Sequence, residues 1–333
     1  MSATVEQILA LFKQRQTYYG PLHAQMQAVQ TIYNNNAPIP LPDMQRNAAP
    51  SVPNLLAQGV DQMAGRIAST IPQASFTSVK PGQRKADREA SNAGRTITGW
   101  WQREQLPMKL KRRARHLIAY AMSPVQVRWD AELNQPIRQL RSPMECYPST
   151  DMLDGECIPT DAIFAYRRSY GWLKSQGYHL KMMELFGANA QMADNTDVLL
   201  VEYIDSEECV LLAAGYRNDQ FAQQQYPTEG MTGVVLERYK HHAGQCPVSI
   251  PMRMTLDGPA GQFDTMIGMY LMQARMTALE QIAVEKGIFP DTYLVSRAGE
   301  MARFIDGPHD GRTGLINIVT GGDIKDLPSQ PGY

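Results

Sequence analysis

Apolar residues recur at three- and four-residue steps through one long stretch late in the chain, which predicts the helix around which the rest is organised. A breaker cluster at residues 257–261 precedes it, Gly287 ends it, and Pro290 follows as expected beyond a helix C-terminus. The apolar face comprises Phe263, Met266, Ile267, Tyr270, Leu271, Met276, Leu279, Ile282 and Ala283. Because this face is too wide for a simple surface helix, we expect burial on most sides, either as a central core helix or between copies in a ring.

The same periodicity predicts a helix-rich N-terminal part. Its expected helices span residues 2–16, 22–33, 55–69, 84–105 and 108–122. Gly20 is expected to separate the first two helices, and Asn54 to cap the third. Residues 37–53, rich in proline and asparagine, predict an extended arm, and residues 75–79 a short strand.

After residue 122 the pattern changes to a period of two, which predicts strands. The expected strands span residues 125–129, 137–140, 162–167, 197–204, 208–213, 234–239, 248–254, 292–295 and 315–319. Residues 142–148 continue as an extended segment and residues 170–186 are mostly helical. A short helix at 298–304, a loop at 306–312 and a turn at 321–323 complete the assignment. Helices, then a mixed sheet region, then a long helix indicate an α+β fold rather than a βαβ alternation.

Composition indicates an ordinary globular protein. Of 333 residues, 43% are hydrophobic and 20% charged, and the formal net charge of −1 gives no global basic field for nucleic acid. Four widely spaced cysteines predict free thiols in a reducing compartment. We expect neither secretion nor membrane insertion, because the N-terminus lacks a signal-peptide core and no apolar run is long enough to span a bilayer. The 19 methionines suit adaptable packing against the chain itself or its partners.

No catalytic or cofactor motif is present: the chain lacks GxSxG, GxxxxGK[ST], HExxH and GxGxxG, so we expect no enzyme and no cofactor. Three sparse polar clusters come nearest to a metal or acid–base site, and each is better explained as a solvated loop. They are His241, His242 and Cys246; Asp306, His309 and Asp310; and Asp151, Asp154 and Glu156.

One basic cluster stands out within the helix expected at residues 108–122. It contains Lys109, Lys111, Arg112, Arg113 and Arg115, with His116 beside them. Such a face can hold DNA phosphates through charge alone or contact a capsid, and the alternative is a solvated face paired with neighbouring carboxylates. The preceding Trp100 and Trp101 can act as a stacking surface or, more commonly, as anchors to a core.

Several short segments resemble the portal proteins, the head-to-tail connectors of tailed bacteriophages, especially those of phages that infect actinobacteria. The segments are Tyr18-Tyr19-Gly20; Pro53-Asn54 leading toward Asp61, Met63 and Arg66; residues 142–148; the block 257–295; residues 314–319; and residues 322–325. The resemblance covers most of the chain, but each motif is short and structural.

The resemblance implies a homo-oligomeric ring, usually of twelve subunits, at one capsid vertex, through which double-stranded DNA is packaged and ejected. It implies residues 1–122 as the helical part of the wing, 123–256 as its mixed α/β part, 257–297 as the long helix and following strand, and 298–333 as a stem- and clip-like region. The implied partners are the terminase large subunit, a head-completion or adaptor protein, the major capsid protein and a scaffold protein, with assembly in the host cytoplasm and no membrane.

The resemblance also suggests roles for individual residues. Arg312, Asn317 and Lys325 are candidates for the clip or channel, whereas the long helix is the candidate for subunit packing. Its proposed packing residues are Phe263, Met266, Tyr270, Met276 and Leu279. The Gly/Pro-rich residues 330–333 look like a lead-in to further helices, so we expect a truncated chain that lacks the crown. The alternatives are another capsid-associated connector or assembly protein and, third, a soluble enzyme acting on nucleic acid.

Overall fold

The computed structural model describes residues 3–39, 52–70, 75–130, 134–151, 157–186, 193–216, 231–256, 258–288, 292–305 and 319–326. The chain is a mixed α+β protein, as predicted, and it divides into two units. Unit 1 comprises residues 1–30 and 57–264, and unit 2 comprises residues 31–56 and 265–333. None of the described helices is long and apolar enough to cross a lipid bilayer.

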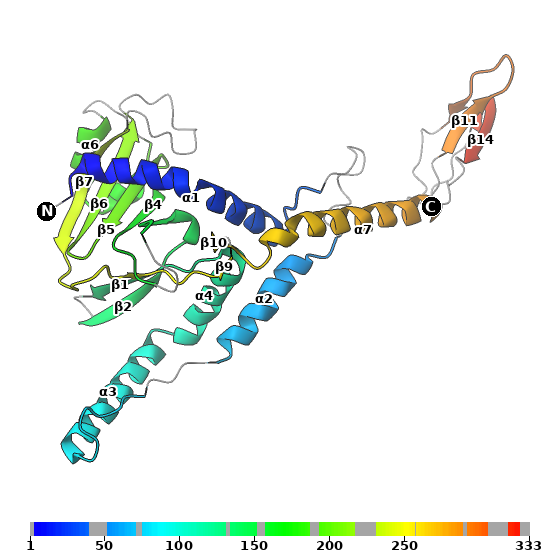
Figure 1. Cartoon of the computed structure of the whole chain (residues 1–333). Helices are drawn as coiled ribbons and strands as arrows, with labels where there is room; N and C mark the ends of the chain where they lie inside the picture. The colour runs from blue at the N-terminus through cyan, green and yellow to red at the C-terminus, as the bar shows by residue number, and fades with distance from the viewer. Residues whose placement is uncertain are drawn as a thin grey trace. The chain divides into compact units, whose positions relative to one another are not determined.

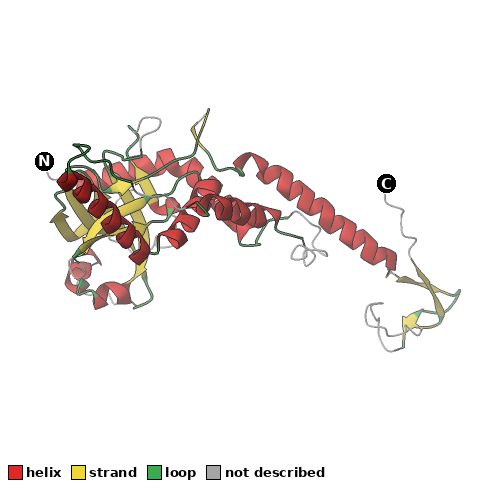
Figure 2. Cartoon of the chain, turned by 90° about the horizontal axis from the view of Figure 1, so that it is seen from below, coloured by secondary structure: helices red, strands yellow, loops and turns green. Residues whose placement is uncertain are grey.

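A five-stranded antiparallel sheet forms the centre of unit 1 (Figure 1). Its order is β3 (Cys146–Pro148), β4 (Ala162–Ser169), β5 (Asp197–Ile204), β6 (Glu208–Tyr216) and β7 (Met231–Lys240). The predicted β5–β6 hairpin is confirmed, and its turn is held by Asp205, whose Oδ1 accepts the N–H groups of Glu207 and Glu208 at 2.7 and 2.8 Å. In Figure 2 the strands of this unit lie between helices.

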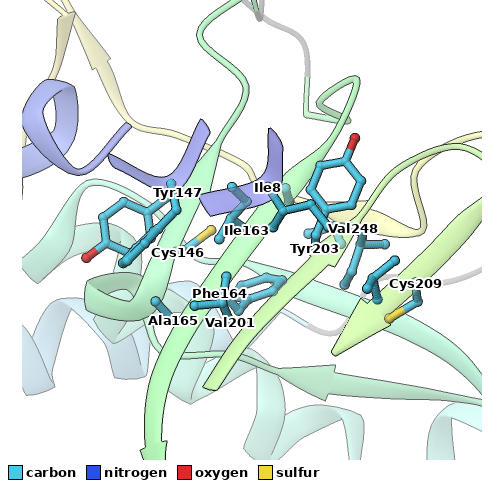
Figure 3. Packing of buried hydrophobic residues seen from close by; sticks show 14 of the residues in the cluster. Ile8, Cys146, Tyr147, Ile163, Phe164, Ala165, Val201, Tyr203, Cys209 and Val248 are labelled. Atoms are coloured by element: carbon cyan, nitrogen blue, oxygen red, sulfur yellow. The ribbon is translucent and has the colours of Figure 1, made fainter. Parts of the chain in front are cut away.

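The two faces of the sheet have different helical covers because side chains alternate along each strand. On β5, Val201 and Tyr203 join the cluster beneath helix α1 (Val5–Tyr33). Val198 and Leu200 face the other way, toward helices α5 (Tyr170–Ser175) and α6 (His179–Phe186). Figure 3 shows Ile8 of α1 on the same side of the sheet as Ile163 and Tyr203.

Helix α1 is continuous, so the predicted break at Gly20 is wrong. Pro21 lies inside the helix and removes one backbone donor, yet packing on both sides of it holds the two halves in line. Tyr147 makes edge-on ring contacts with Phe12, before the proline, and His23, after it, at centroid distances of 5.2 and 4.8 Å. Arg15 is paired with Asp161 and donates to the Tyr147 carbonyl at 3.2 Å, which ties the first half to the sheet.

Unit 1 also contains a three-stranded antiparallel sheet, in the order β2 (Gln135–Leu140), β1 (Val125–Asp130) and β8 (Val248–Ser249). The strand predicted at 248–254 is therefore too long. Its continuation is an isolated bridge between Met252 and Met122 and the short ladder of β9 (Met254–Thr255) with β10 (Gly258–Pro259). The segment 142–148 is a 3₁₀ turn, Pro143–Glu145, followed by β3, rather than extended throughout.

Three helices follow the predicted order: α2 (Leu55–Ala68), α3 (Arg84–Arg103) and α4 (Leu106–Tyr120). The side-chain amide of Asn54 donates to the Ile32 and Tyr33 carbonyls at 2.6 and 3.3 Å, so it satisfies carbonyls at the end of α1. The strand predicted at residues 75–79 does not form; Val79 is 95% exposed, and these residues pair with no strand in the described part of the chain.

Unit 2 is organised by helix α7 (Ile267–Ile288), preceded by a 3₁₀ turn at Asp264–Met266. Beyond it, β11 (Thr292–Ser296) pairs with β14 (Gly322–Asp326), and β12 (Arg303–Phe304) with β13 (Val319–Thr320), all antiparallel. The helix end near Gly287 and the strand at 292–295 are confirmed.

The helix predicted at residues 298–304 is wrong. Gly299 has a left-handed φ of 88°, and the Ala302 N–H donates to the Ser296 hydroxyl oxygen at 3.1 Å, so the segment turns back toward the strands. The turn predicted at 321–323 is shorter than expected, since Gly321 takes a φ of 73° and β14 begins at Gly322. The loop expected at 306–312, most of the strand expected at 315–319 and most of the arm expected at 37–53 lie outside the described residues.

Candidate nucleic-acid and subunit interfaces

Helix α4 carries the basic cluster, but two of its five cations are neutralised by carboxylates. Lys109 forms an ion pair with Glu104 and also donates to the Arg138 carbonyl at 2.9 Å. Arg115 donates from Nε to Asp61 Oδ1 of α2 at 2.7 Å. For these residues the structure favours the paired, solvated face over a free phosphate-binding face.

The remaining cations on α4 do not share one surface. Arg113 is half-buried in a small hollow beside Leu110 and Leu140, and burial lowers its pKa. His116 is also largely buried, which lowers its pKa to about 4 and keeps it neutral at pH 7. Lys111 and Arg112 are the exposed members of the cluster. The five-residue basic cluster expected from the sequence is therefore reduced to one exposed pair.

Trp100 anchors the C-terminal end of α3 to the β1–β2 hairpin. Its indole N–H donates to the Pro136 carbonyl at 2.7 Å, and the Arg138 guanidinium lies 4.5 Å from its ring centroid. Burial lowers the pKa of Arg138, an effect that nearby Glu104 opposes. The anchoring interpretation of this tryptophan is thus supported over a stacking surface for bases.

Helix α7 has two different apolar sides within unit 2. Ala274, Ala278 and Ile282 are buried on one side, where Val52 and Ile39 pack against the two alanines. The expectation that α7 is a central core helix of the chain is wrong, because most of its remaining apolar residues face solvent. On the second side Met269, Met272 and Met276 are 67, 69 and 52% exposed; Leu279 is half-buried, and Ala283 is exposed.

The second side of α7 has heptad spacing. Residues 269, 272, 276, 279 and 283 alternate steps of three and four, which is the pattern of a coiled-coil seam. With about 100° of rotation per residue, this stripe lies about 140° around the helix from the buried side. We call residues 269, 272, 276, 279 and 283 the α7 seam.

The residues proposed for subunit packing divide between these environments. Met276 and Leu279 belong to the α7 seam. Phe263 packs its ring tip against Gly59 inside unit 1, where a β-carbon on Gly59 would come within 3.2 Å of the ring. Tyr270 is half-buried, with its hydroxyl 3.5 Å from the Pro53 carbonyl, and Met266 is exposed but lies off the seam.

Of the proposed clip or channel residues, Lys325 is exposed on β14, where it pairs in register with Tyr293 of β11. Arg312 and Asn317 lie outside the described residues. The structure therefore brings no set of channel candidates together among the residues it describes.

The sparse polar clusters have structural roles or fall outside the described part of the chain. His241 uses both ring nitrogens locally: Nε2 donates to the Asp205 carbonyl at 2.9 Å, and Nδ1 accepts the Ala243 N–H at 3.2 Å. Burial raises the pKa of Cys246 to about 12, and its thiol points to the Ile204 carbonyl. Asp154, Glu156 and residues 306–310 are not described. Across the described residues, no group of three or more His, Cys, Asp or Glu side chains is arranged to hold a metal ion.

One buried polar network among the described residues of unit 1 was not expected from the sequence. Arg141 donates from Nη1 to Glu202 Oε2 and to Gln126 Oε1, both at 2.8 Å, while Gln126 Nε2 donates to Glu202 Oε1 at 2.9 Å. The Arg141 guanidinium also lies 4.3 Å from the Phe164 ring centroid. Burial alone would lower the pKa of Arg141, but the Glu202 carboxylate outweighs it and the pKa is raised.

This network joins the three-stranded and five-stranded sheets of unit 1, since Gln126 belongs to β1 and Glu202 to β5. Both the Arg141 and Glu202 side chains are about nine-tenths buried. A usable signal was present in the sequence: Glu202 interrupts the apolar strand 198–204, where a lone buried carboxylate requires a cation. The partner, 61 residues away, could not be inferred from spacing.

Comparison of the whole chain with protein-family models and with curated proteins finds no match.

Proposed function

We propose that this chain is a subunit of a portal ring of a tailed bacteriophage, a structural conduit for double-stranded DNA rather than an enzyme. The resemblance of segments spread along the chain motivates the proposal, and the α+β architecture, with the 22-residue helix α7 late in the chain, is compatible with it. The observation that carries it in the structure is the α7 seam, an exposed apolar stripe on a helix whose opposite side is already covered.

An exposed methionine stripe favours association with another copy of the chain. Burying a methionine side chain stabilises by about 1.5–3 kcal/mol, so three exposed methionines on one seam represent a considerable driving force. Methionine also adapts its shape to a partner helix. In a closed ring each subunit would offer this seam to a neighbour and receive a different surface in return, which is a heterologous contact.

A near-neutral chain suits a conduit through which DNA must slide. Each phosphate neutralised by a cation strengthens sequence-independent binding, so a dense basic lining would retain the DNA. The formal charge of −1 is compatible with a weakly binding channel. In this proposal the ring sits at one capsid vertex of the virion with wing, stem and clip regions. It contacts the major capsid protein and a scaffold protein, and docks first the terminase large subunit and later a head-completion or adaptor protein.

Native mass spectrometry of the purified protein, with negative-stain electron microscopy, tests the proposal. We expect a closed assembly of about twelve copies with a hole wide enough for duplex DNA. A closed assembly without such a hole would instead favour another capsid-associated connector. A protein that remains monomeric at all concentrations would overturn the proposal for this chain.

A matched pair of variants links assembly to the α7 seam. Met276→Glu places a charge on the seam, whereas Val284→Glu places the same charge at a residue that is equally apolar, 63% exposed and off the seam. We expect the first variant to lose the ring and the second to keep it, with similar thermal unfolding of both. Equal assembly of the two variants would exclude the seam as the subunit contact.

A further inference from the structure

Helix α3 differs from the other long helices of unit 1 because none of its 20 residues is buried. It carries five basic residues, all of them exposed: Arg84, Lys85, Arg88, Arg95 and Arg103. None of these five forms an ion pair with a described residue, in contrast to Lys109 and Arg115 of α4. A helix that contributes so little to the core and keeps its cations unpaired has a surface available for a partner.

The five cations lie on one side of the helix. At about 100° per residue, Arg84, Arg95 and Arg88 fall within about 40° of one another, and Lys85 and Arg103 lie about 60° further round. We call these five residues the α3 basic arc. The acidic residues of the helix, Asp87 and Glu89, fall outside it on either flank. The remaining positions within the arc are uncharged: Asn92, Gly99 and Gln102, with Ser91 just beside it.

The arc adjoins a shallow hollow of about 490 Å³ between α3 and the segment containing Ser75 and Phe76. Arg95 lines this hollow together with Ser91 and Gln102, while Gly94 and Gly99 leave room beside them. A guanidinium next to a hydroxyl and an amide is a donor set suited to phosphate oxygens.

We propose that the α3 basic arc binds the phosphate backbone of duplex nucleic acid. From Arg84 to Arg103 the arc extends about 28 Å along the helix, long enough to reach several phosphates. It carries no aromatic residue on which unpaired bases could stack, which favours a duplex over a single strand. This inference concerns one helix of a single chain and does not require the ring proposed above.

The opposite side of α3 argues against a lipid surface as the partner. A membrane-binding amphipathic helix needs large apolar side chains opposite its charges. Here that side offers mainly the small residues Ala86, Ala90 and Gly94. Its large side chains are Ile97 and Trp101, both half-buried, and Trp100, which is already engaged with Pro136. The side of α3 that is free to bind is therefore its cationic side.

The test compares two triple variants that remove the same number of positive charges. Arg84→Gln, Arg88→Gln and Arg95→Gln together remove the centre of the arc. Lys13→Gln, Lys174→Gln and Lys240→Gln together remove three exposed cations from α1, α5 and β7. Binding of a fluorescent 30-base-pair duplex is measured between 50 and 200 mM NaCl for both variants and the wild type.

Each lost phosphate contact weakens binding about eightfold at 0.1 M salt, so we expect the arc variant to bind on the order of several hundredfold more weakly. The slope of log K against log salt should fall by about 2.7, whereas the control variant should change affinity less than threefold. Equal losses of affinity in both variants would mean that binding depends on net charge alone and not on the α3 basic arc, which would overturn the proposal. Tighter binding of a single strand of equal length, or of anionic phospholipid vesicles, would overturn it as well.

Folding and assembly are checked separately. Because α3 has no buried residue, the arc variant should keep the wild-type circular dichroism spectrum and melting temperature. Its assembly mass should also remain that of the wild type, since the seam lies on α7. If the arc variant loses DNA binding but assembles like the wild type, the α3 basic arc is supported as the DNA-binding surface. Failure of the wild-type protein to assemble bears only on the portal proposal.

Discussion

Replacing Glu202 by glutamine should be among the most destabilising single substitutions in unit 1. The carboxylate accepts a charge-assisted bond from Arg141 at 2.8 Å and a second bond from Gln126 at 2.9 Å, in a site where both charged side chains are about nine-tenths buried. Without the carboxylate, Arg141 keeps its charge but loses its counter-ion. Breaking one partner of a buried ion pair costs about 3–5 kcal/mol, and we expect the loss in unfolding free energy to fall in this range.

Urea unfolding, followed by tryptophan fluorescence and circular dichroism, measures this loss as a lower midpoint with an unchanged slope. Glu207→Gln provides the control, because Glu207 is exposed in the β5–β6 turn and is held there through its backbone: its N–H donates to Asp205 and its carbonyl accepts the His241 N–H at 3.2 Å. That substitution should change the unfolding free energy by less than about 0.5 kcal/mol.

A triple variant separates the charge from the packing. Replacing Arg141 by methionine, and Glu202 and Gln126 by leucine, removes all three polar partners at once and fills a similar volume. Buried ion pairs replaced by apolar residues are often neutral or stabilising, so most of the stability lost in Glu202→Gln should return. A cost below about 1 kcal/mol for Glu202→Gln alone would show that water or another group compensates Arg141, and the reasoning would fail.

Three further predictions follow from the fold. Pro21→Ala should stabilise unit 1 by about 1–2 kcal/mol in urea unfolding, because it restores a backbone donor inside α1; a destabilised variant would mean that the proline is needed for the course of the helix. Burial lowers the pKa of His23 and His116 to about 4 from an ordinary value of 6.5, although hydrogen bonds to the Cys146 and Pro143 carbonyls oppose the shift at His23. Stability should therefore be complete above about pH 6.5 and fall as the pH drops toward 4, by on the order of 2–3 kcal/mol per histidine, and a glutamine at either position should flatten a urea titration run from pH 7 to 4.5. Native protein should react rapidly with a thiol reagent at Cys157 alone, because Cys146, Cys209 and Cys246 are buried and their pKa values are raised. The unfolded protein should react at all four thiols, and rapid labelling of a native Cys157→Ser variant would contradict this burial.

Local sequence patterns were sufficient where one short-range signal dominated. The alternation of residues 197–204 and the Asp205 turn predicted the β5–β6 hairpin, and the breakers around α7 predicted its extent to within a few residues. They failed where a distant contact outweighed a local preference. Packing of Tyr147 against both halves of α1 overrides Gly20 and Pro21, and the bond from Ala302 to Ser296 replaces a predicted helical turn.

The sequence by itself determined the fold class, most element positions and the presence of charge clusters, because periodicity and turn residues act over a few positions. Tertiary structure decided which charges are free. Helical spacing put Lys109 and Arg113 on a common face, but Glu104 pairs with Lys109 and Arg113 is half-buried in the hollow beside Leu110. Arg115, in the same basic cluster, is paired with Asp61. The tertiary structure also leaves α3 without a buried residue. It pairs Glu202 with Arg141, which are far apart in the sequence. Ion pairing and burial depend on which segments lie next to one another in the folded protein, and local periodicity does not contain that information.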